Sequence, residues 1–402
     1  MKVYFSGISG TGIGPLAEFA QDAGFEVIGS DLQRGAIASE LDERAIPVHY
    51  GEQDGSFLRE AAAVDWLVYT SALPDNHPEL LAAHELGIKA TKRDEFIAEL
   101  VRQKNLKMIG VAGTHGKTTT TSMIIWACLK LGIPVNYLVG TTLGWAKSGH
   151  FSTDAEYFVY EADEYDRNFL AYHPEIAVIT CVDYDHPDIY PTREEYQVAF
   201  KQYESQSKNV VKNTTIDPRL TLVGELRRED ASIALRVLKM ISDFSEEEIC
   251  KVLNDFPGVG RRFERIAKGI YSDYGHHPEE IKATIKMAKE LKQRDGHAGL
   301  AVIYQPHQNT RQHEVRHLYH DAFIGADKIF WLPTYLTRED PNLETLSAKE
   351  LSDELENKDV VECTEINDEL TQKVRDLQTK NWLIVLITAG PADNWLRENF
   401  AN

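Results

Sequence analysis

The residues of this chain that could do chemistry are concentrated between Lys107 and Thr121. An apolar run there predicts a buried strand, and the pattern after a glycine turn predicts a helix. The turn and the helix start consist of Gly113, Thr114, His115, Gly116, Lys117, Thr118 and Thr119. The glycines allow backbone N–H groups to face phosphate oxygens, and the helix N-terminus adds its dipole. We therefore expect a nucleotide site in which Lys117 reaches the β- and γ-phosphates and Thr118 ligates Mg²⁺.

A second glycine loop lies near the start of the chain, from Gly7 to Gly14, between a predicted strand and a predicted helix. It fits a dinucleotide-binding pattern, and Asp31 ends the next predicted strand near the position that binds a ribose. Taken alone, this pattern is weak support for NAD, because the same loop would bind any diphosphate, including that of a UDP-sugar.

Acidic residues and histidines follow several predicted strands. Glu161 follows the strand predicted at 157–160, and His186 lies shortly after the next strand. Each could be a solvated loop residue, but α/β sheets bind ligands at these strand ends. Beside a phosphate loop, both are candidate magnesium ligands. The adjacent pair His276-His277 favours a hydrogen-bonding role over a metal site, because neighbouring side chains at a strand end point in different directions.

Composition narrows the class of protein. The 402 residues suffice for two or three domains of roughly 100–200 residues each, and 43% are hydrophobic. A formal net charge of −20 argues against nucleic acid or an anionic membrane as a partner. Four scattered cysteines suit a reducing cytoplasm without a structural zinc site. We expect no signal peptide and no membrane span, since no apolar run reaches about 18–20 residues.

Strands and helices alternate along the whole chain, which predicts an α/β fold with mainly parallel sheets. We expect a Rossmann-like domain over residues 1–103, a shortened central parallel sheet of the phosphate-loop type over 104–257, and a second Rossmann-like domain over 258–402. Within the central domain, a helix is expected from about 230 to 242.

An ordered series of motifs resembles the Mur ligases, the ATP-dependent amide-forming enzymes of peptidoglycan precursor synthesis. The motifs, in chain order, are Gly7-Ile-Ser-Gly-Thr-Gly12, Gly29-Ser-Asp31, Thr70-Ser-Ala72, Asn76-His-Pro-Glu79, Gly113-Thr-His-Gly-Lys-Thr-Thr119, Glu161-Ala-Asp-Glu164, Asp185-His186, Arg261-Arg-Phe263, Asp273-Tyr-Gly-His-His-Pro278, and Gln305-Pro-His307 with Thr310-Arg311. The series spans the whole chain, and as an ordered set it is specific. It favours the branch that joins L-alanine to UDP-N-acetylmuramate.

The resemblance implies a two-step reaction. The carboxylate of UDP-N-acetylmuramate attacks the γ-phosphate of ATP to give an acyl phosphate, and the amino group of L-alanine then displaces phosphate. It also implies Mg²⁺ or Mn²⁺ as cofactor, held by Thr118, Glu161 and His186. Membership of this family is compatible with either a monomer or a homodimer.

The resemblance implies further roles for single residues. Lys117, Glu161 and His186 would be catalytic, together with His276 and with Arg311, which would hold the carboxylate of the amino acid. Asp273 would join the phosphate loop in binding ATP. The residues expected to bind the UDP-sugar are Gly10, Thr11, Gly12, Asp31 and Ser71.

The sequence departs from the family pattern at the adenine site. The family's Gly-x-His-Asn segment would fall at 224–227, where the His and Asn are absent, and Asp230 stands where a second Asn is usual. Only 23 residues separate Phe200 from Gly224, so part of the central domain is missing. Two alternatives stay open within this fold: a tripeptide-recycling ligase acting on UDP-N-acetylmuramate, and a catalytically weak paralogue that binds nucleotide. A nicotinamide dehydrogenase would leave 113–119 unexplained.

Overall fold

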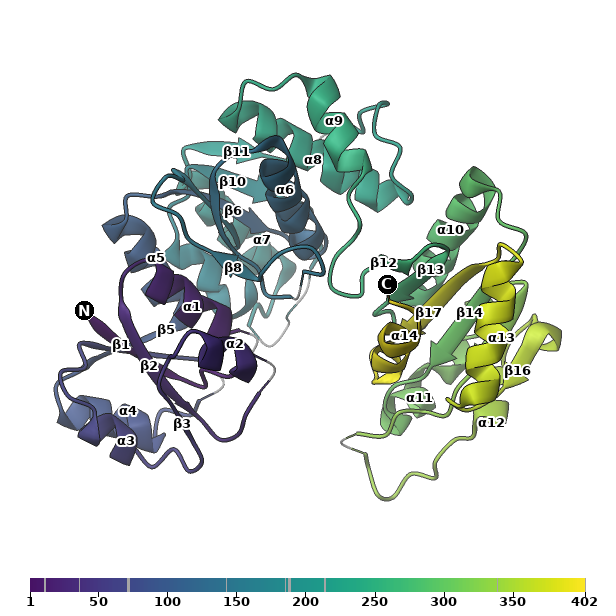
Figure 1. Cartoon of the computed structure of the whole chain (residues 1–402), viewed down its shortest axis with the longest axis horizontal. Helices are drawn as coiled ribbons and strands as arrows, with labels where there is room; N and C mark the ends of the chain where they lie inside the picture. The colour runs from purple at the N-terminus through teal and green to yellow at the C-terminus, as the bar shows by residue number, and fades with distance from the viewer. Residues whose placement is uncertain are drawn as a thin grey trace. The chain divides into compact units, whose positions relative to one another are not determined.

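The fold was analysed in a computed structural model of the whole chain (Figure 1). The structure describes residues 1–10, 12–35, 37–70, 73–141, 143–184, 186, 189–212, 215–337 and 339–401. The chain separates into two compact units, and each is described by itself. The first comprises Met1–Thr221 with Leu226–Phe256, and the second comprises Leu222–Glu225 with Pro257–Asn402.

The first unit begins with a five-stranded parallel sheet in the order β3-β2-β1-β4-β5. Its strands are β1 (Lys2–Ser6), β2 (Glu26–Asp31), β3 (Val48–Tyr50), β4 (Trp66–Tyr69) and β5 (Lys89–Lys92). Its helices are α1 (Gly14–Asp22), α2 (Ala38–Glu43), α3 (Ser56–Glu60), α4 (Pro78–Glu85) and α5 (Arg93–Gln103). Apolar side chains of α1 and α5 pack on one face of the sheet, and those of α3 and α4 pack on the other. Both faces are covered, as expected for a parallel sheet.

The same unit contains a six-stranded sheet in the order β11-β10-β6-β9-β7-β8, parallel except for β8. Its strands are β6 (Lys107–Ala112), β7 (Val135–Leu138), β8 (Gly149–His150), β9 (Tyr157–Glu161), β10 (Ile176–Ile179) and β11 (Asn209–Val211). Its helices are α6 (Lys117–Leu131), η1 (Tyr165–Ala171), α7 (Arg193–Ser205), α8 (Glu225–Ile241) and α9 (Glu246–Asn254). Strand β6 lies between β10 and β9, so the phosphate loop that follows it is flanked by the ends of both neighbours.

The two sheets of this unit share one apolar core. The ring of Phe19 on α1 lies 5.2 Å from that of Phe158 on β9. Polar contacts join the same elements: Lys92 pairs with Asp166 at 2.7 Å, and the Tyr172 hydroxyl donates to Asp94 at 2.7 Å. The shared core explains why two sheets form a single compact unit.

Helix α8 begins about five residues earlier than expected, at Glu225 rather than near 230. Gly224 precedes it with a φ of +89°, a conformation that glycine adopts without steric cost, and an acidic residue follows in the first turn. The expected helix start was wrong because four of the five residues 225–229 are charged and the fifth, Leu226, is exposed, so this turn shows no apolar periodicity. The segment 225–227 therefore lies in the first turn of a helix, and Gly224 precedes it.

The second unit is built on a six-stranded sheet in the order β12-β13-β17-β14-β15-β16, parallel except for β12. Its strands are β12 (Glu264–Ala267), β13 (Ile270–Asp273), β14 (Leu300–Gln305), β15 (Lys328–Trp331), β16 (Val361–Cys363) and β17 (Leu383–Thr388). Its helices are α10 (Pro278–Asp295), α11 (Asn309–Val315), η2 (Arg316–Leu318), α12 (Ala348–Ser352), η3 (Lys358–Val360), α13 (Asp368–Thr379) and α14 (Ala392–Phe400). Helix α10 packs on one face, and α13 and α14 pack on the other. With three such sheets, the expected α/β fold is confirmed.

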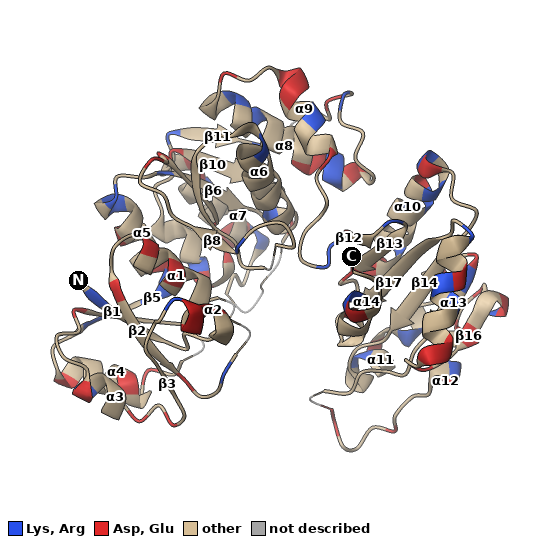
Figure 2. Cartoon of the chain, viewed as in Figure 1, with Lys and Arg blue, Asp and Glu red and all other residues tan. Residues whose placement is uncertain are grey.

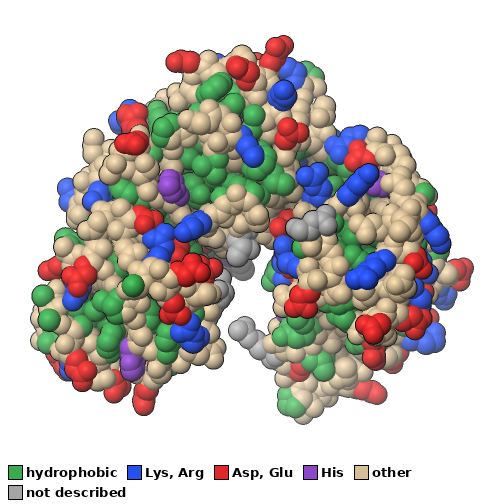
Figure 3. All heavy atoms as spheres, in the orientation of Figure 1, with side chains coloured by type: hydrophobic (Ala, Val, Ile, Leu, Met, Phe, Trp, Pro, Cys, Tyr) green, Lys and Arg blue, Asp and Glu red, His purple; other side chains and the backbone are tan. Residues whose placement is uncertain are grey.

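The surface carries both signs of charge. Basic and acidic residues are interspersed along helices such as α10 and α13 (Figure 2). Charged and apolar side chains are mixed on the face of the molecule shown in Figure 3. Among the described residues, no helix has both the length and the apolar character that crossing a membrane requires.

Candidate active site

The phosphate loop, residues 113–119, is fixed by its own backbone conformation and by contacts with the residues that follow β10. Gly113 and Gly116 have φ values of +138° and +83°, and Gly116 caps α6. The Thr114 N–H donates to the carbonyl of Cys181 at 3.1 Å, and the Thr114 hydroxyl donates to the carbonyl of Asp183 at 2.6 Å. The hydroxyl of Thr180 donates to the carbonyl of His115. These contacts therefore fix the loop to the end of the neighbouring strand, directly before the start of α6.

The ammonium of Lys117 is fully engaged in this structure. It donates to the carbonyl of Gly113 at 2.7 Å and to both carboxylate oxygens of Glu164, at 2.8 and 2.9 Å. The Glu164 side chain is 1% exposed, so the ion pair is shielded from water. Nε2 of His186 lies 3.6 Å from the same carboxylate. A buried carboxylate thus holds Lys117 and lies close to His186, two of the residues that were expected to be catalytic.

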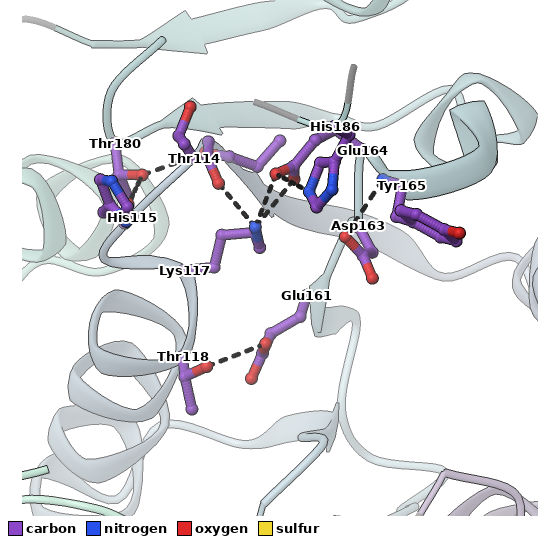
Figure 4. A network of polar contacts seen from close by, with 12 residues as sticks. Thr114, His115, Lys117, Thr118, Glu161, Asp163, Glu164, Tyr165, Thr180 and His186 are labelled. Atoms are coloured by element: carbon purple, nitrogen blue, oxygen red, sulfur yellow. Dashed lines mark hydrogen bonds and ion pairs between the residues drawn. The ribbon is translucent and has the colours of Figure 1, made fainter. Parts of the chain in front are cut away.

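The hydroxyl of Thr118 donates to Oε2 of Glu161 at 3.1 Å, at the end of β9. Figure 4 shows Lys117 directed toward Glu164, with the contact between Thr118 and Glu161 lying apart from it. Within the described residues, no three His, Cys, Asp or Glu side chains gather closely enough to hold a metal ion by themselves. A hydroxyl and a carboxylate are oxygen ligands of the kind that Mg²⁺ accepts when nucleotide phosphates and water complete its shell.

The first glycine loop is also tied to a strand end. The N–H of Ser9 donates to the carboxylate of Asp31 at 2.9 Å, which places this acid beside the loop. The N–H of Gly14 donates to the carbonyl of Gly10 at 2.9 Å, and Gly12 lies between them. Two of the residues expected to bind the UDP-sugar, Thr11 and Ser71, lie outside the described residues.

In the second unit, Asp273 ends β13 and its carboxylate turns inward. It accepts bonds from the N–H groups of Phe263 and Gly275, at 2.8 and 2.9 Å, and from the Thr284 hydroxyl at 2.8 Å. Burial raises the pKa of this carboxyl, and the three hydrogen bonds oppose that rise. Asp273 therefore fixes the start of β12 and α10 against its own strand.

Cationic side chains gather around His307, just beyond the end of β14. Its ring lies 6.3 Å from that of His276. Burial lowers the pKa of His307, and the nearby Arg311, His276 and Arg261 lower it further, opposed by Glu339. The described residues give half-buried Arg311 no hydrogen bond or ion pair. The guanidinium of Arg311 is therefore available to bind a carboxylate through two parallel hydrogen bonds. Beside it lies the His307 imidazole, whose neutral form is favoured.

Nδ1 of His276 lies 3.2 Å from the carbonyl oxygen of Tyr274 and 3.5 Å from the carboxylate of Glu280. Nδ1 of His277 instead accepts the N–H of Glu279 at the start of α10. The two rings thus have different partners, as expected for adjacent residues.

Sequence reasoning missed the role of Glu164 as partner of Lys117. The acid was visible only as the last residue of a motif at the end of β9, and nothing in its spacing indicated a buried position. The need of the lysine for a counter-ion was the one signal that could have found it. His307 was likewise visible only within a motif, because its cationic neighbours come from other segments of the second unit.

Comparison with known protein families gives three matches. Residues 2–105 match the model of the Mur ligase family catalytic domain, 111–229 match the Mur ligase middle domain, and 261–390 match the Mur ligase glutamate ligase domain. Together these models cover most of the chain, in the order expected for one enzyme.

Two relatives show the extent of the likeness. A UDP-N-acetylmuramate–L-alanine ligase from Fusobacterium nucleatum is 31% identical over 433 residues, covering 91% of this chain and 90% of the relative. One with the same name from Carboxydothermus hydrogenoformans is 33% identical over 403 residues, covering 85% and 83%. The chain is thus similar to these enzymes over nearly their whole length.

Solved structures show the same fold. The UDP-N-acetylmuramate–alanine ligase from Thermotoga maritima superposes with a TM-score of 0.74 at 21% identity, covering 99% of this chain and 98% of that one. A murein peptide ligase from Psychrobacter arcticus superposes with a TM-score of 0.56 at 20% identity, covering 97% and 96%.

Proposed function

The chain belongs to the Mur ligase family, and from that premise we propose that it joins L-alanine to UDP-N-acetylmuramate at the expense of ATP. The product would be an amide, released with ADP and phosphate, for the synthesis of peptidoglycan. One observation carries the proposal: Lys117 and the Thr118–Glu161 pair lie together at the end of β6 and β9, where a nucleotide phosphate would bind.

In the first step, a carboxylate oxygen of the sugar acid bonds to the γ-phosphorus of ATP while the bond to the β-phosphate oxygen breaks. Negative charge builds on the transferred group and on the leaving ADP. Lys117, at the start of α6, is positioned to neutralise it, and the loop N–H groups add fixed dipoles. Glu164 would orient the ammonium until the phosphates arrive.

The divalent cation would be held by the Thr118 hydroxyl and the Glu161 carboxylate. Thr118 and Glu161 fit a divalent cation, because their two oxygens already face each other at 3.1 Å. When bound, the ion supplies charge neutralisation for phosphoryl transfer. Nε2 of His186 lies 3.6 Å from the Glu164 carboxylate that pairs with Lys117, so we assign His186 to the acyl phosphate rather than to the ion at Thr118 and Glu161.

In the second step, the amino group of alanine bonds to the acyl carbon, and phosphate leaves. The carboxylate of the amino acid would bind Arg311, because a guanidinium can donate two parallel hydrogen bonds to the two carboxylate oxygens. His307, with its lowered pKa, would face the amine as a neutral acceptor. Asp273 would support this region of the second unit from within.

Phosphate release tests the proposal with purified protein, ATP, Mg²⁺ and UDP-N-acetylmuramate. A panel of single amino acids and a free tripeptide with an unblocked amino terminus serves as the acceptor. We expect release that depends on both UDP-N-acetylmuramate and a small amino acid, with L-alanine the best, and none for Lys117→Ala. Release that requires the tripeptide would assign the recycling activity instead. Wild-type protein that binds nucleotide but releases no phosphate with any acceptor would make it a binding protein.

A further inference from the structure

A cavity of about 250 Å³ lies within the first unit, between the first glycine loop and the end of β9. Gly12, Pro15 and Leu16 line it from the first loop and α1, and Tyr160, Glu161 and Asp163 line it from the end of β9. The remaining wall comes from Arg93 and Ile97 on α5 and from the end of β7. The cavity therefore connects the expected sugar-nucleotide loop with the carboxylate that is paired with the phosphate loop.

The cavity is lined by charges of both signs. Glu161 and Asp163 are the carboxylates among the lining residues, and Arg93 is the cation. Its Nη1 lies 3.4 Å from the point that a Cβ on Gly12 would occupy, so the guanidinium rests against the backbone of the first glycine loop. The cavity thus holds both signs of charge, with the guanidinium of Arg93 at the first glycine loop and the carboxylate of Asp163 near enough to act on it.

The position of Arg93 is fixed by its neighbours. It is the first residue of α5, and its side chain is 29% exposed. Its Nη2 lies 3.4 Å from Oδ1 of Asp94, the one hydrogen bond that the described residues give it. The same oxygen accepts the hydroxyls of Tyr160 and Tyr172, at 3.3 and 2.7 Å. A buried carboxylate therefore orients the guanidinium, and most of its five N–H donors stay unused.

We propose that Arg93 binds the diphosphate of the sugar nucleotide, a role that rests on the proposed function. An anion at the first glycine loop meets the N-terminus of α1 and the guanidinium together, and Arg matches phosphate oxygens through paired donors. The sugar then fills the cavity, and its acid side chain extends to the end of β9. There the carboxylate meets Glu161, which repels it unless a cation lies between them.

Calorimetric binding without ATP tests this assignment independently of turnover. The ligands are UDP, UDP-N-acetylglucosamine, which lacks the acid side chain, and UDP-N-acetylmuramate. For Arg93→Met we expect affinity for all three to fall by a similar factor of about 10 to 100, since a charge-assisted contact to the shared diphosphate is lost. Arg93→Lys should fall between this variant and the wild type, because it keeps the charge and loses the fork.

Arg102→Met is the matched control, because Arg102 lies on the same helix with a side chain 73% exposed and should bind like the wild type. Thermal unfolding checks that each variant is folded, and Arg93→Lys carries the test if Arg93→Met does not fold. A loss confined to UDP-N-acetylmuramate would move Arg93 to the carboxylate and overturn the inference. Unchanged affinity for all three ligands would also overturn it. Wild-type protein that binds none of them would overturn the proposed function itself.

Discussion

Lys117 donates to both carboxylate oxygens of Glu164, at 2.8 and 2.9 Å, in a pair whose acid is almost completely buried. A buried carboxylate without a counter-ion is costly, so each partner needs the other. In the proposed function this ammonium also meets the phosphates of ATP, and the pair holds it at the loop in advance. The pair also places a negative charge beside the proposed phosphate site.

Glu164→Gln should separate these two effects. The amide keeps an acceptor for Lys117 but loses the charge, so we expect kcat to fall by about 10- to 100-fold, the value of one charge-assisted hydrogen bond. Affinity for ADP should rise by about threefold, because a repelling charge has been removed. Steady-state kinetics measures kcat, and calorimetric titration measures the affinity for ADP.

The control for that experiment is Glu195→Gln. Glu195 pairs with Arg167 at 3.3 Å on the surface, and its side chain is 48% exposed. Losing the same charge there should leave both quantities unchanged, since exposed pairs contribute little. If Glu164→Gln also matches the wild type in both kcat and affinity for ADP, the buried pair has no role in turnover.

Glu161→Gln should raise the magnesium requirement steeply. The neutral amide is a weaker ligand than the carboxylate that now faces the Thr118 hydroxyl. We expect the Mg²⁺ concentration for half-maximal phosphate release to increase by at least about tenfold, because the ion supplies much of the charge neutralisation. A magnesium titration identical to that of the wild type would make the carboxylate a bystander.

Asp273→Ala should destabilise the second unit. The substitution leaves two N–H groups, those of Phe263 and Gly275, without the acceptor that they have in the wild type. Leaving a buried donor unsatisfied costs about 1–3 kcal/mol, so the free energy of unfolding should fall by about 2–4 kcal/mol. Urea unfolding measures it. Should stability stay within about 0.5 kcal/mol while only the KM for ATP rises, Asp273 contacts nucleotide rather than its own unit.

The long strands could be predicted because parallel sheets bury both faces and give continuous apolar runs, as in β6, β14 and β17. Strand β7 escaped prediction, since it contains Asn136, a fully buried polar side chain. That side chain donates to the carbonyl of Ala155 at 3.0 Å and accepts the N–H of Ser152 at 2.6 Å. Burial of a polar group depends on such partners, which no local pattern reveals.

The same limit applies to the candidate site. Loop residues such as Lys117 and Thr118 follow from a local pattern of strand, glycines and helix. The partners that orient them come from other strands: Glu164 from beyond β9, and His186 from beyond β10. Arg93 begins α5, a helix that packs on the first sheet, and only the shared core of the first unit brings it to the same cavity as the end of β9.

The last prediction concerns the base of the nucleotide. The segment 224–227 lacks the side-chain amide and imidazole of the family pattern, and two other residues could have replaced them. Asp230 is buried and accepts the Thr120 hydroxyl at 3.1 Å, with its carboxylate against Gly116 of the phosphate loop. The guanidinium of Arg227 lies 5.9 Å from the ring centre of Phe256. Both side chains are thus engaged by residues of their own unit.

A site that encloses a ring without hydrogen-bonding its polar groups discriminates weakly between purines. We therefore expect GTP to support phosphate release with a kcat/KM within about tenfold of that for ATP, a difference of about 1.4 kcal/mol. Measuring both values with UDP-N-acetylmuramate and L-alanine held saturating decides the matter. UTP serves as the control, because a pyrimidine would fill the space of a purine poorly and should be used less well than either. A preference for ATP above about a thousandfold requires hydrogen bonds to the base, and it would show that the chain has rebuilt an adenine contact elsewhere.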